Sequence, residues 1–256
     1  MAAEIEIARV QAAVGDRWRL VYRREVDSTM TMARELAECG APAGTVALAD
    51  AQRAGRGRLG RSWVSEPGVN LYFTVVLRPA LDVLRQLAML TPLAVAEGIE
   101  RAAGVNTEVK WPNDVQIGGR KVSGVLIDAE VRGSEPALAL VGIGINVNFD
   151  SSAVPELREV ATSIRAVLGR PVPREAVLAA VLGRMAALLD RCSSGGSVRD
   201  AWRARLNTLG REIALRAGER IVRGRAVDVS EDGGLVLQLA DGMREVFAAG
   251  EVTLSV

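Results

Sequence analysis

The sequence contains no histidine, which removes the imidazole on which many catalytic sites depend. Without it the chain cannot build a Ser-His-Asp or Cys-His nucleophile, and zinc or non-haem iron sites become unfavourable. The two cysteines, Cys39 and Cys192, are isolated and form no CxxC pair. Catalysis by this chain must therefore rest on positioning, on cations and on backbone donors.

Lysine is nearly absent as well. Of the 32 basic residues only two are lysines, Lys110 and Lys121, and both lie in the stretch KWPNDVQIGGRKVSG. Lysine carries a compact ammonium with a shiftable pKa, whereas arginine carries a planar fork with a fixed charge. A genome that prefers arginine would explain either lysine alone. Their shared position in one motif-like stretch favours a function at a bound anion.

Long apolar runs are also missing. No stretch of about 18 uncharged apolar residues predicts a membrane span, and the N-terminus lacks the pattern of a signal peptide. The formal net charge of +1 gives no overall reason to expect binding to nucleic acid or membrane. The segment before Ser28 is too short for a helix-turn-helix. We therefore expect a cytoplasmic protein, without an N-terminal DNA-binding domain, that binds neither DNA nor membranes.

The 256 residues, of which 49% are hydrophobic, can bury a sizeable core, and their pattern predicts several helices. Asp27 or Ser28 can cap a helix that ends before Gly40. A helical pattern over 81–103 contains Pro92, which requires either a kink or a break. Further helices are expected in an amphipathic segment that starts at Pro173 and over residues 198–209.

Strands are expected between these helices and after them. The segments that alternate or run apolar between turn residues are 44–50, 69–77, 107–117, 121–131 and 137–149. From Arg211 onward, short apolar runs separated by Gly and Asp predict a small all-β module. The fold class is thus α/β (α+β), with a mixed sheet flanked by helices. We expect one domain over 1–209 and a second over 210–256.

Residues 55–63, GRGRLGRSW, hold three arginines and three glycines in nine positions. Glycine permits close backbone approach, so this loop can wrap an anion with its amides while the arginines supply charged donors. It is neither a Walker P-loop nor a dinucleotide motif. The alternative is a flexible basic loop or an RNA-binding patch. Trp63 is either an adenine platform or a core anchor.

Two further runs carry polar residues among apolar ones. In KWPND, Asp114 can form an ion pair with Lys110 or help to bind magnesium, and the ion pair is favoured. Lys121 precedes an apolar strand in which Gly124 marks a close approach of ligand or backbone, although a surface lysine in a hairpin is the alternative. In the run GIGIN, Asn146 can bind a nucleotide or cap a bulge.

Together these runs, in this order, closely resemble the biotin protein ligase family, also called biotin–[acetyl-CoA-carboxylase] ligase. The matching motifs are DST at 27–29, Gln52, GRGRLGRSW at 55–63, KWPNDV at 110–115, RKVSG at 120–124 and GIGIN at 142–146. The resemblance covers essentially the whole chain and implies a biotin/lipoate ligase-like catalytic domain with a C-terminal SH3-like β-barrel. It implies a ligase that uses biotin and ATP, with Mg²⁺ as activator, to form biotinyl-5′-AMP and pyrophosphate. The biotinyl group then passes to one lysine of a biotin carboxyl carrier protein.

The same resemblance assigns roles to individual residues. Catalysis is assigned to Lys121, Arg56 and Arg58. Biotin binding is assigned to Ser28, Thr29, Met30, Gln52, Arg56, Gly57, Arg58, Lys121 and Gly124. Nucleotide binding is assigned to Trp63, Asn113, Asn146 and Arg56, and Asp114 is the candidate magnesium ligand. Met30 stands where the family usually has Asn, which puts one polar contact in doubt.

Three other functions remain open. A lipoate or octanoate ligase or transferase would share the fold and a lysine, although the GRGRxGRxW run favours biotin. A biotin-sensing repressor would need a DNA-binding domain, and a non-catalytic biotin-binding sensor would need no catalytic lysine. We expect a monomer or a homodimer.

Overall fold

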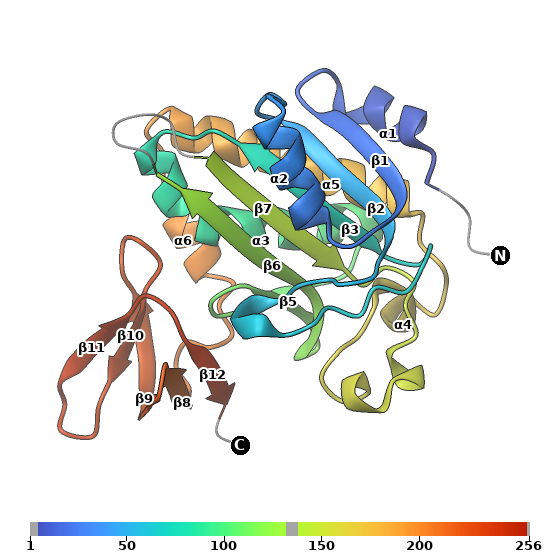
Figure 1. Ribbon diagram of the computed structural model, residues 1–256. Helices are drawn as coiled ribbons and strands as arrows, with labels where there is room; N and C mark the ends of the chain where they lie inside the picture. The colour runs from blue at the N-terminus through green and yellow to red at the C-terminus, as the bar shows by residue number, and fades with distance from the viewer. Residues whose placement is uncertain (1–4, 132–137, 255–256) are drawn as a thin grey trace.

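The computed structural model describes residues 5–131 and 138–254, which form two β-sheets with helices around the larger one (Figure 1). The seven-stranded sheet has the order β1-β2-β3-β7-β6-β5-β4, and the five-stranded sheet has the order β11-β10-β9-β8-β12. In the larger sheet only β1 and β2 run parallel, so the sheet is mixed. The expected fold class, a mixed sheet flanked by helices with a small SH3-like β module, is confirmed.

The first sheet is built from strands of unequal length. Their bounds are β1 Arg19–Val26, β2 Thr45–Gln52, β3 Leu71–Leu77, β4 Glu108–Lys110, β5 Asp114–Ile117, β6 Arg120–Glu130 and β7 Leu138–Ile145. Strands β6 and β7 pair along their length, whereas β5 pairs only with the first part of β6. A register shift between Val115 and Gln116 accompanies this short pairing.

Helices cover both faces of the sheet (Figure 1). Their bounds are α1 Ile7–Val14, α2 Thr29–Glu38, α3 Leu81–Ala103, α4 Ile164–Leu168, α5 Arg174–Ser193 and α6 Arg199–Arg203. α3 and α5 pack on one face, where Val46 and Leu48 of β2 join the main core. α2 packs on the opposite face, where Ala47 of the same strand joins a smaller core. The alternation of β2 therefore supplies both layers.

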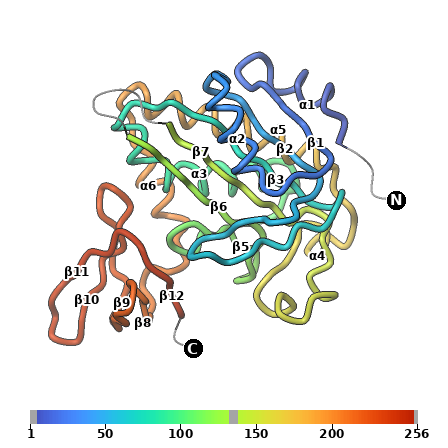
Figure 2. Tube along the Cα trace, viewed as in Figure 1, coloured from blue at the N-terminus to red at the C-terminus, as the bar shows by residue number. Residues whose placement is uncertain are grey.

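The chain ends in the five-stranded sheet, whose course is traced in red in Figure 2. Its strands are β8 Glu212–Ala217, β9 Arg220–Val229, β10 Leu235–Gln238, β11 Arg244–Phe247 and β12 Glu251–Leu254. Their inward side chains join the main core, so this module is packed against the first sheet. The domain division after residue 209 stays a prediction.

The structure tests several of the helices and strands predicted from the sequence. Ser28 caps α2, and α3 passes through Pro92 as one continuous helix. The expectation of one strand over 107–117 was wrong, because a turn at Trp111–Pro112 divides it into the hairpin β4–β5. The expected helix over 198–209 is shorter and ends at Arg203.

Other parts of the fold were not foreseen from the pattern. α1 and β1 were not anticipated, and residue 137 of an expected strand lies outside the described residues. Within the described ranges, no helix has both the length and the apolar character needed to cross a membrane.

Candidate active site

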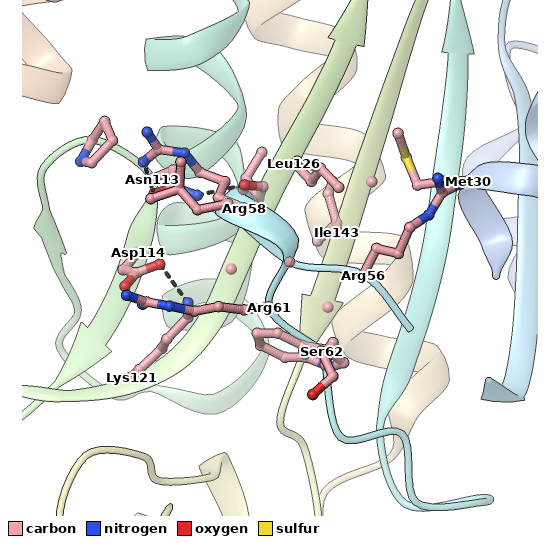
Figure 3. A pocket seen from close by; sticks show the side chains of 18 of the residues that line it. Met30, Arg56, Arg58, Arg61, Ser62, Asn113, Asp114, Lys121, Leu126 and Ile143 are labelled. Carbon is pink, nitrogen blue, oxygen red and sulfur yellow. Dashed lines mark hydrogen bonds and ion pairs between the residues drawn. The ribbon is translucent and has the colours of Figure 1, made fainter. Parts of the chain in front are cut away.

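A cavity opens on the α2 side of the large sheet, beside the helix and under the Arg/Gly loop of residues 55–63 (Figure 3). Its empty space, including the open solvent at its mouth, is about 1040 Å³. The elements that contribute to its wall are α2, β2, the loop, the β4–β5 turn, β6, β7 and the segment that leads into β12. Residues far apart in the sequence therefore meet around one space.

The floor of the cavity is made by glycines of β6 and β7. Gly124 and Gly144 are direct partners across the two strands. A Cβ at Gly144 would lie 2.6 Å from the Trp63 ring, and one at Gly124 would lie 2.9 Å from it. A Cβ at Gly142 would lie 2.7 Å from the Met30 sulfur. Glycine is required here because side chains from other elements lie directly on the strand backbone.

Hydroxyl and amide groups gather at the end of the cavity next to α2. Ser28 caps the helix by accepting from the Met30 amide at 3.3 Å. The Thr29 amide donates to Gln52 Oε1 at 2.9 Å, and Thr74 Oγ1 donates to Thr29 Oγ1 at 2.9 Å. This end is polar and ordered, with Met30 as its one thioether.

The Arg/Gly loop closes on itself and reaches three other elements. The Gly57 amide donates to the Arg61 carbonyl at 2.7 Å, which holds the loop as a narrow turn. Arg56 donates to Thr31 Oγ1 of α2 at 3.0 Å. Arg58 donates to Asn113 Oδ1 at 3.0 Å and to the Gly250 carbonyl at 3.4 Å. The loop thus connects α2, the β4–β5 turn and the C-terminal module.

Both lysines line the cavity, but their partners differ from the sequence-based expectation. Asp114 forms its ion pair with Lys121, at 2.6 Å, rather than with Lys110. Lys110 is the cross-strand neighbour of Asp114 in the hairpin, and no ion pair of Lys110 occurs within the described residues. Lys121 Nζ also lies 5.3 Å from the centre of the Trp63 ring, within the range of a cation–π contact.

The cations around Asp114, at the end of the cavity away from α2, are incompletely neutralised. Burial lowers the pKa of the Lys110 ammonium, and the nearby charges of Lys121 and Arg61 lower it further against the opposing effect of Asp114. Burial likewise lowers the pKa of the Arg58 guanidinium. Arg61 contacts the Glu251 carboxylate. A cluster of cations that depress one another's pKa favours a bound anion in the space between them.

The β4–β5 turn is held from two sides. The Trp111–Pro112 peptide bond is cis, and the buried Trp111 indole donates to the Gly233 carbonyl at 2.9 Å. Asn113 Nδ2 donates to the Val125 carbonyl at 2.5 Å, while its oxygen accepts from Arg58. The turn therefore presents Asn113 and Asp114 to the cavity from a fixed backbone.

Most of the residues singled out in the sequence lie in this one wall. They are Ser28, Thr29, Met30, Gln52, Arg56, Gly57, Arg58, Trp63, Asn113, Asp114, Lys121 and Gly124. Asn146 is not among them: it is buried, and its Nδ2 donates to the Thr162 carbonyl at 3.0 Å. Its role at a nucleotide stays a prediction.

Other lining residues were missed from the sequence. They include Gly142, Gly144 and the stretch Gly250–Val252. The glycine spacing in GIGIN could have indicated a floor, because Gly142 and Gly144 point to the same side of one strand. Nothing in the local sequence indicates Gly250–Val252, since their position depends on how the C-terminal module packs.

Comparison with known proteins gives matches over both parts of the chain. A family model described as "Biotin/lipoate A/B protein ligase family" matches residues 22–146, and one described as "Biotin protein ligase C terminal domain" matches residues 208–255. The biotin--[acetyl-CoA-carboxylase] ligase of Paracoccus denitrificans is 36% identical, over 88% of this chain and 96% of its own length. The bifunctional ligase/repressor BirA of Bacillus subtilis is 33% identical, over 90% of this chain and 72% of its own.

A solved structure is similar over nearly the same extent. The biotin protein ligase from Aquifex aeolicus in complex with biotin and ATP shares 34% sequence identity and superposes with a TM-score of 0.78. The match covers 93% of this chain and 98% of the Aquifex chain. Both sheets are therefore included in the similarity.

Proposed function

The chain belongs to the biotin protein ligase family, and we propose from this premise that it joins biotin to ATP as biotinyl-5′-AMP and passes the biotinyl group to a lysine of a carrier protein. It is an ATP-dependent ligase. The observation that carries the proposal is the single cavity in which the head-group residues, the Arg/Gly loop and Lys121 meet. A binding sensor would need the head-group end alone.

We assign the biotin head group to the polar end of the cavity. Ser28, Thr29 and Gln52 supply hydroxyl and amide groups there, which suit the ureido group of biotin. Met30 lies at the same end and offers sulfur and methylene surface in place of an amide. Met30 and Trp63, which lie on the glycines of the floor, offer apolar surface to a chain that extends toward Lys121.

Activation requires a biotin carboxylate oxygen to attack the α-phosphorus of ATP while pyrophosphate leaves. Two anionic groups must approach each other, so cations have to neutralise both in the transition state. Lys121 is our candidate for the carboxylate and the new acyl-phosphate linkage. Arg56 and Arg58 are our candidates for closing the loop, with Gly57, over the intermediate. In the second step the acceptor amine attacks the acyl carbon, AMP leaves, and an amide bond forms.

We assign the nucleotide to the opposite end of the cavity. Trp63 offers a ring face and Asn113 a polar contact at that end, while Arg56 would reach the nucleotide from the α2 side, where it donates to Thr31. Asn146 remains a weaker candidate because it lies behind the wall. Lys110 extends this set, since it has no ion-pair partner within the described residues and its charge suits a triphosphate or its pyrophosphate product.

A resident magnesium site does not fit the residues present. Asp114 is engaged by Lys121, and no group of three or more Asp, Glu, His or Cys side chains suited to a metal ion occurs in the described ranges. Magnesium commonly binds through substrate phosphates with only one or two protein carboxylates. We therefore propose that Mg²⁺ arrives with ATP, and that Asp114 as its ligand is the less favoured role.

The acceptor is proposed to be a biotin carboxyl carrier domain, and the protein to be a monomer or a homodimer.

The decisive experiment incubates purified protein with ATP and biotin, lipoate or octanoate in turn and identifies the adenylates by mass spectrometry. We expect adenylate with biotin only, followed by a single biotinyl addition on a supplied carrier domain. Adenylate formed from lipoate or octanoate instead would overturn the assignment.

A further inference from the structure

A chain of hydrogen bonds joins the polar end of the cavity to the base of the Arg/Gly loop. It begins at Thr74 Oγ1, which donates to Thr29 Oγ1, and continues from Thr29 Oγ1 to Gln52 Oε1 at 3.2 Å. Gln52 Nε2 then donates to Ser65 Oγ at 3.0 Å, and Ser65 Oγ donates to the Trp63 carbonyl at 3.1 Å. The chain therefore runs from the middle of the sheet to the residue that ends the loop.

The backbone at both ends fixes the direction of these bonds. The Thr29 amide can only donate, so the Gln52 atom that faces it must be the oxygen. The Gln52 nitrogen must then face Ser65, and Ser65 must give its own hydrogen to the Trp63 carbonyl. Gln52 lines the cavity, and its second N–H has no acceptor within the part of the chain that the structure describes. That N–H is available to a ligand.

The base of the Arg/Gly loop is packed against the hydrogen bond between Gln52 and Ser65. The Trp63 amide donates to the Gly55 carbonyl at 2.9 Å, which joins the two ends of the loop. A Cβ at Gly55 would lie 2.8 Å from Ser65 Oγ and 3.0 Å from Gln52 Nε2. Gly55 therefore has no room for a side chain. The loop ends, Ser65 and Gln52 form one close-packed unit.

We propose that Ser65 is a positioning residue that couples occupation of the biotin pocket to closure of the Arg/Gly loop. The inference rests on the proposed function, in which Gln52 binds the biotin head group. A ligand bound to the second N–H of Gln52 fixes the amide, and the fixed amide holds Ser65 and the loop base. A loop already held in place presents Trp63 and the arginines to the nucleotide with less ordering, so biotin and nucleotide bind with positive cooperativity.

The test is the coupling between the two ligands. The Kd of biotin is measured by titration calorimetry without and with the α,β-methylene analogue of ATP, which cannot release pyrophosphate. Ser65→Ala removes both hydrogen bonds of the hydroxyl, whereas Ser65→Thr keeps a hydroxyl. Ser194→Ala is the matched control, because Ser194 also donates to a backbone carbonyl, that of Asp190 at 2.9 Å, but outside the cavity.

The coupling is the Kd of biotin without the ATP analogue divided by its Kd with the analogue. In Ser65→Ala we expect this ratio to fall by about 3- to 10-fold, the effect of one or two lost hydrogen bonds. Ser65→Thr and Ser194→Ala should keep the wild-type ratio. A Ser65→Ala ratio that falls by less than about threefold overturns the inference, as does a wild-type ratio near one or a fall shared by Ser194→Ala.

A parallel assay of adenylate formation by the wild type separates this inference from the proposed function. If the wild type forms no biotinyl-AMP, the proposed function fails. If it forms biotinyl-AMP and the Ser65→Ala ratio is unchanged, only the coupling fails.

Discussion

At the scale of single residues, the cavity depends on positions that carry no side chain. Gly124, Gly142 and Gly144 allow Trp63 and Met30 to lie on the backbone of β6 and β7. A methyl group at any of the three would meet a ring or thioether atom at less than 3.0 Å. Because the Trp63 indole also lies near Lys121, its position affects both the floor and the charged end.

Gly144→Ala should therefore displace Trp63 and weaken nucleotide binding. We expect the KM for ATP to rise by about three- to tenfold, the size of effect seen when a packed aromatic contact is lost. Gly183→Ala is the control, because a Cβ at this helical glycine meets nothing within 4 Å. Steady-state adenylate assays on both variants check the prediction. Equal KM values for ATP would contradict it.

Lys121→Ala should abolish most of the activation step. Removal of one charged donor from a closed site lowers the rate of such reactions by about 10²- to 10³-fold. Single-turnover formation of biotinyl-AMP measures this directly. Arg120→Ala is the control, since Arg120 is the exposed neighbour outside the cavity lining. A Lys121→Ala rate close to that of the control would remove Lys121 from the chemistry.

At the scale of elements, the Arg/Gly loop is held at its base and at its tip by different neighbours. Its base rests on Gln52 of β2 through Ser65, while Arg58 at its tip reaches the β4–β5 turn and the segment before β12. Closure of the loop over an intermediate would keep water from the acyl-phosphate bond. The contacts of Arg58, together with the ion pair of Arg61 and Glu251, hold the tip of the loop in place.

Arg58→Gly should consequently loosen the tip and release biotinyl-AMP early. Loss of hydrogen bonds from a charged group predicts a rise of about 10- to 100-fold in the release rate. Release is measured by filtration of preformed adenylate, and by labelling of an added lysine-rich protein. Arg53→Gly, at an exposed arginine outside the cavity lining, is the comparison. Unchanged retention in Arg58→Gly would count against this role.

The elements also show which parts of the site are readable from sequence. The cap at Ser28 and the glycine-rich loop were predictable because they depend on neighbours a few residues away. The partner of Asp114 was not, because the register of β5 against β6 decides that Lys121, rather than Lys110, meets it. The position of Asn146 was not predictable either, because its side chain bonds to the carbonyl of Thr162 in another segment of the chain.

At the scale of the whole molecule, the C-terminal module completes the site instead of merely following it. Gly250 and Glu251 contact the Arg/Gly loop, and Gly233 accepts from Trp111 under the β4–β5 turn. On the other side of this junction, Arg203 of α6 donates to Asp228 of β9 at 2.6 Å. The two sheets should therefore unfold together.

The Asp228 contact gives this junction a predictable pH dependence. The hydrogen bond from Arg203 lowers the pKa of the Asp228 carboxyl, so its contribution to stability is present above the ordinary carboxyl pKa and is lost as pH falls through the lowered value. The side chain is 43% exposed, and solvent screening limits the contribution to about 0.5 kcal/mol.

Urea unfolding of Asp228→Asn at pH 7 and at about pH 2 tests this. We expect the variant to be less stable than the wild type at pH 7 and equal to it in acid. Asp232→Asn provides the comparison, because Asp232 is exposed and forms no ion pair in the described part of the chain. A deficit that persists unchanged in acid would rule out the ionic explanation.

Because both lysines of the chain lie in the cavity wall, their chemical labelling would show whether the cavity is occupied by a ligand. An amine-reactive reagent can label only these two side chains and the N-terminal amine of the chain. The N-terminal amine adds the same label to every molecule, so the further increase in mass counts open cavities without the surface background that lysine-rich proteins give. Titration of any ligand against such labelling would follow closure of the site without a spectroscopic probe.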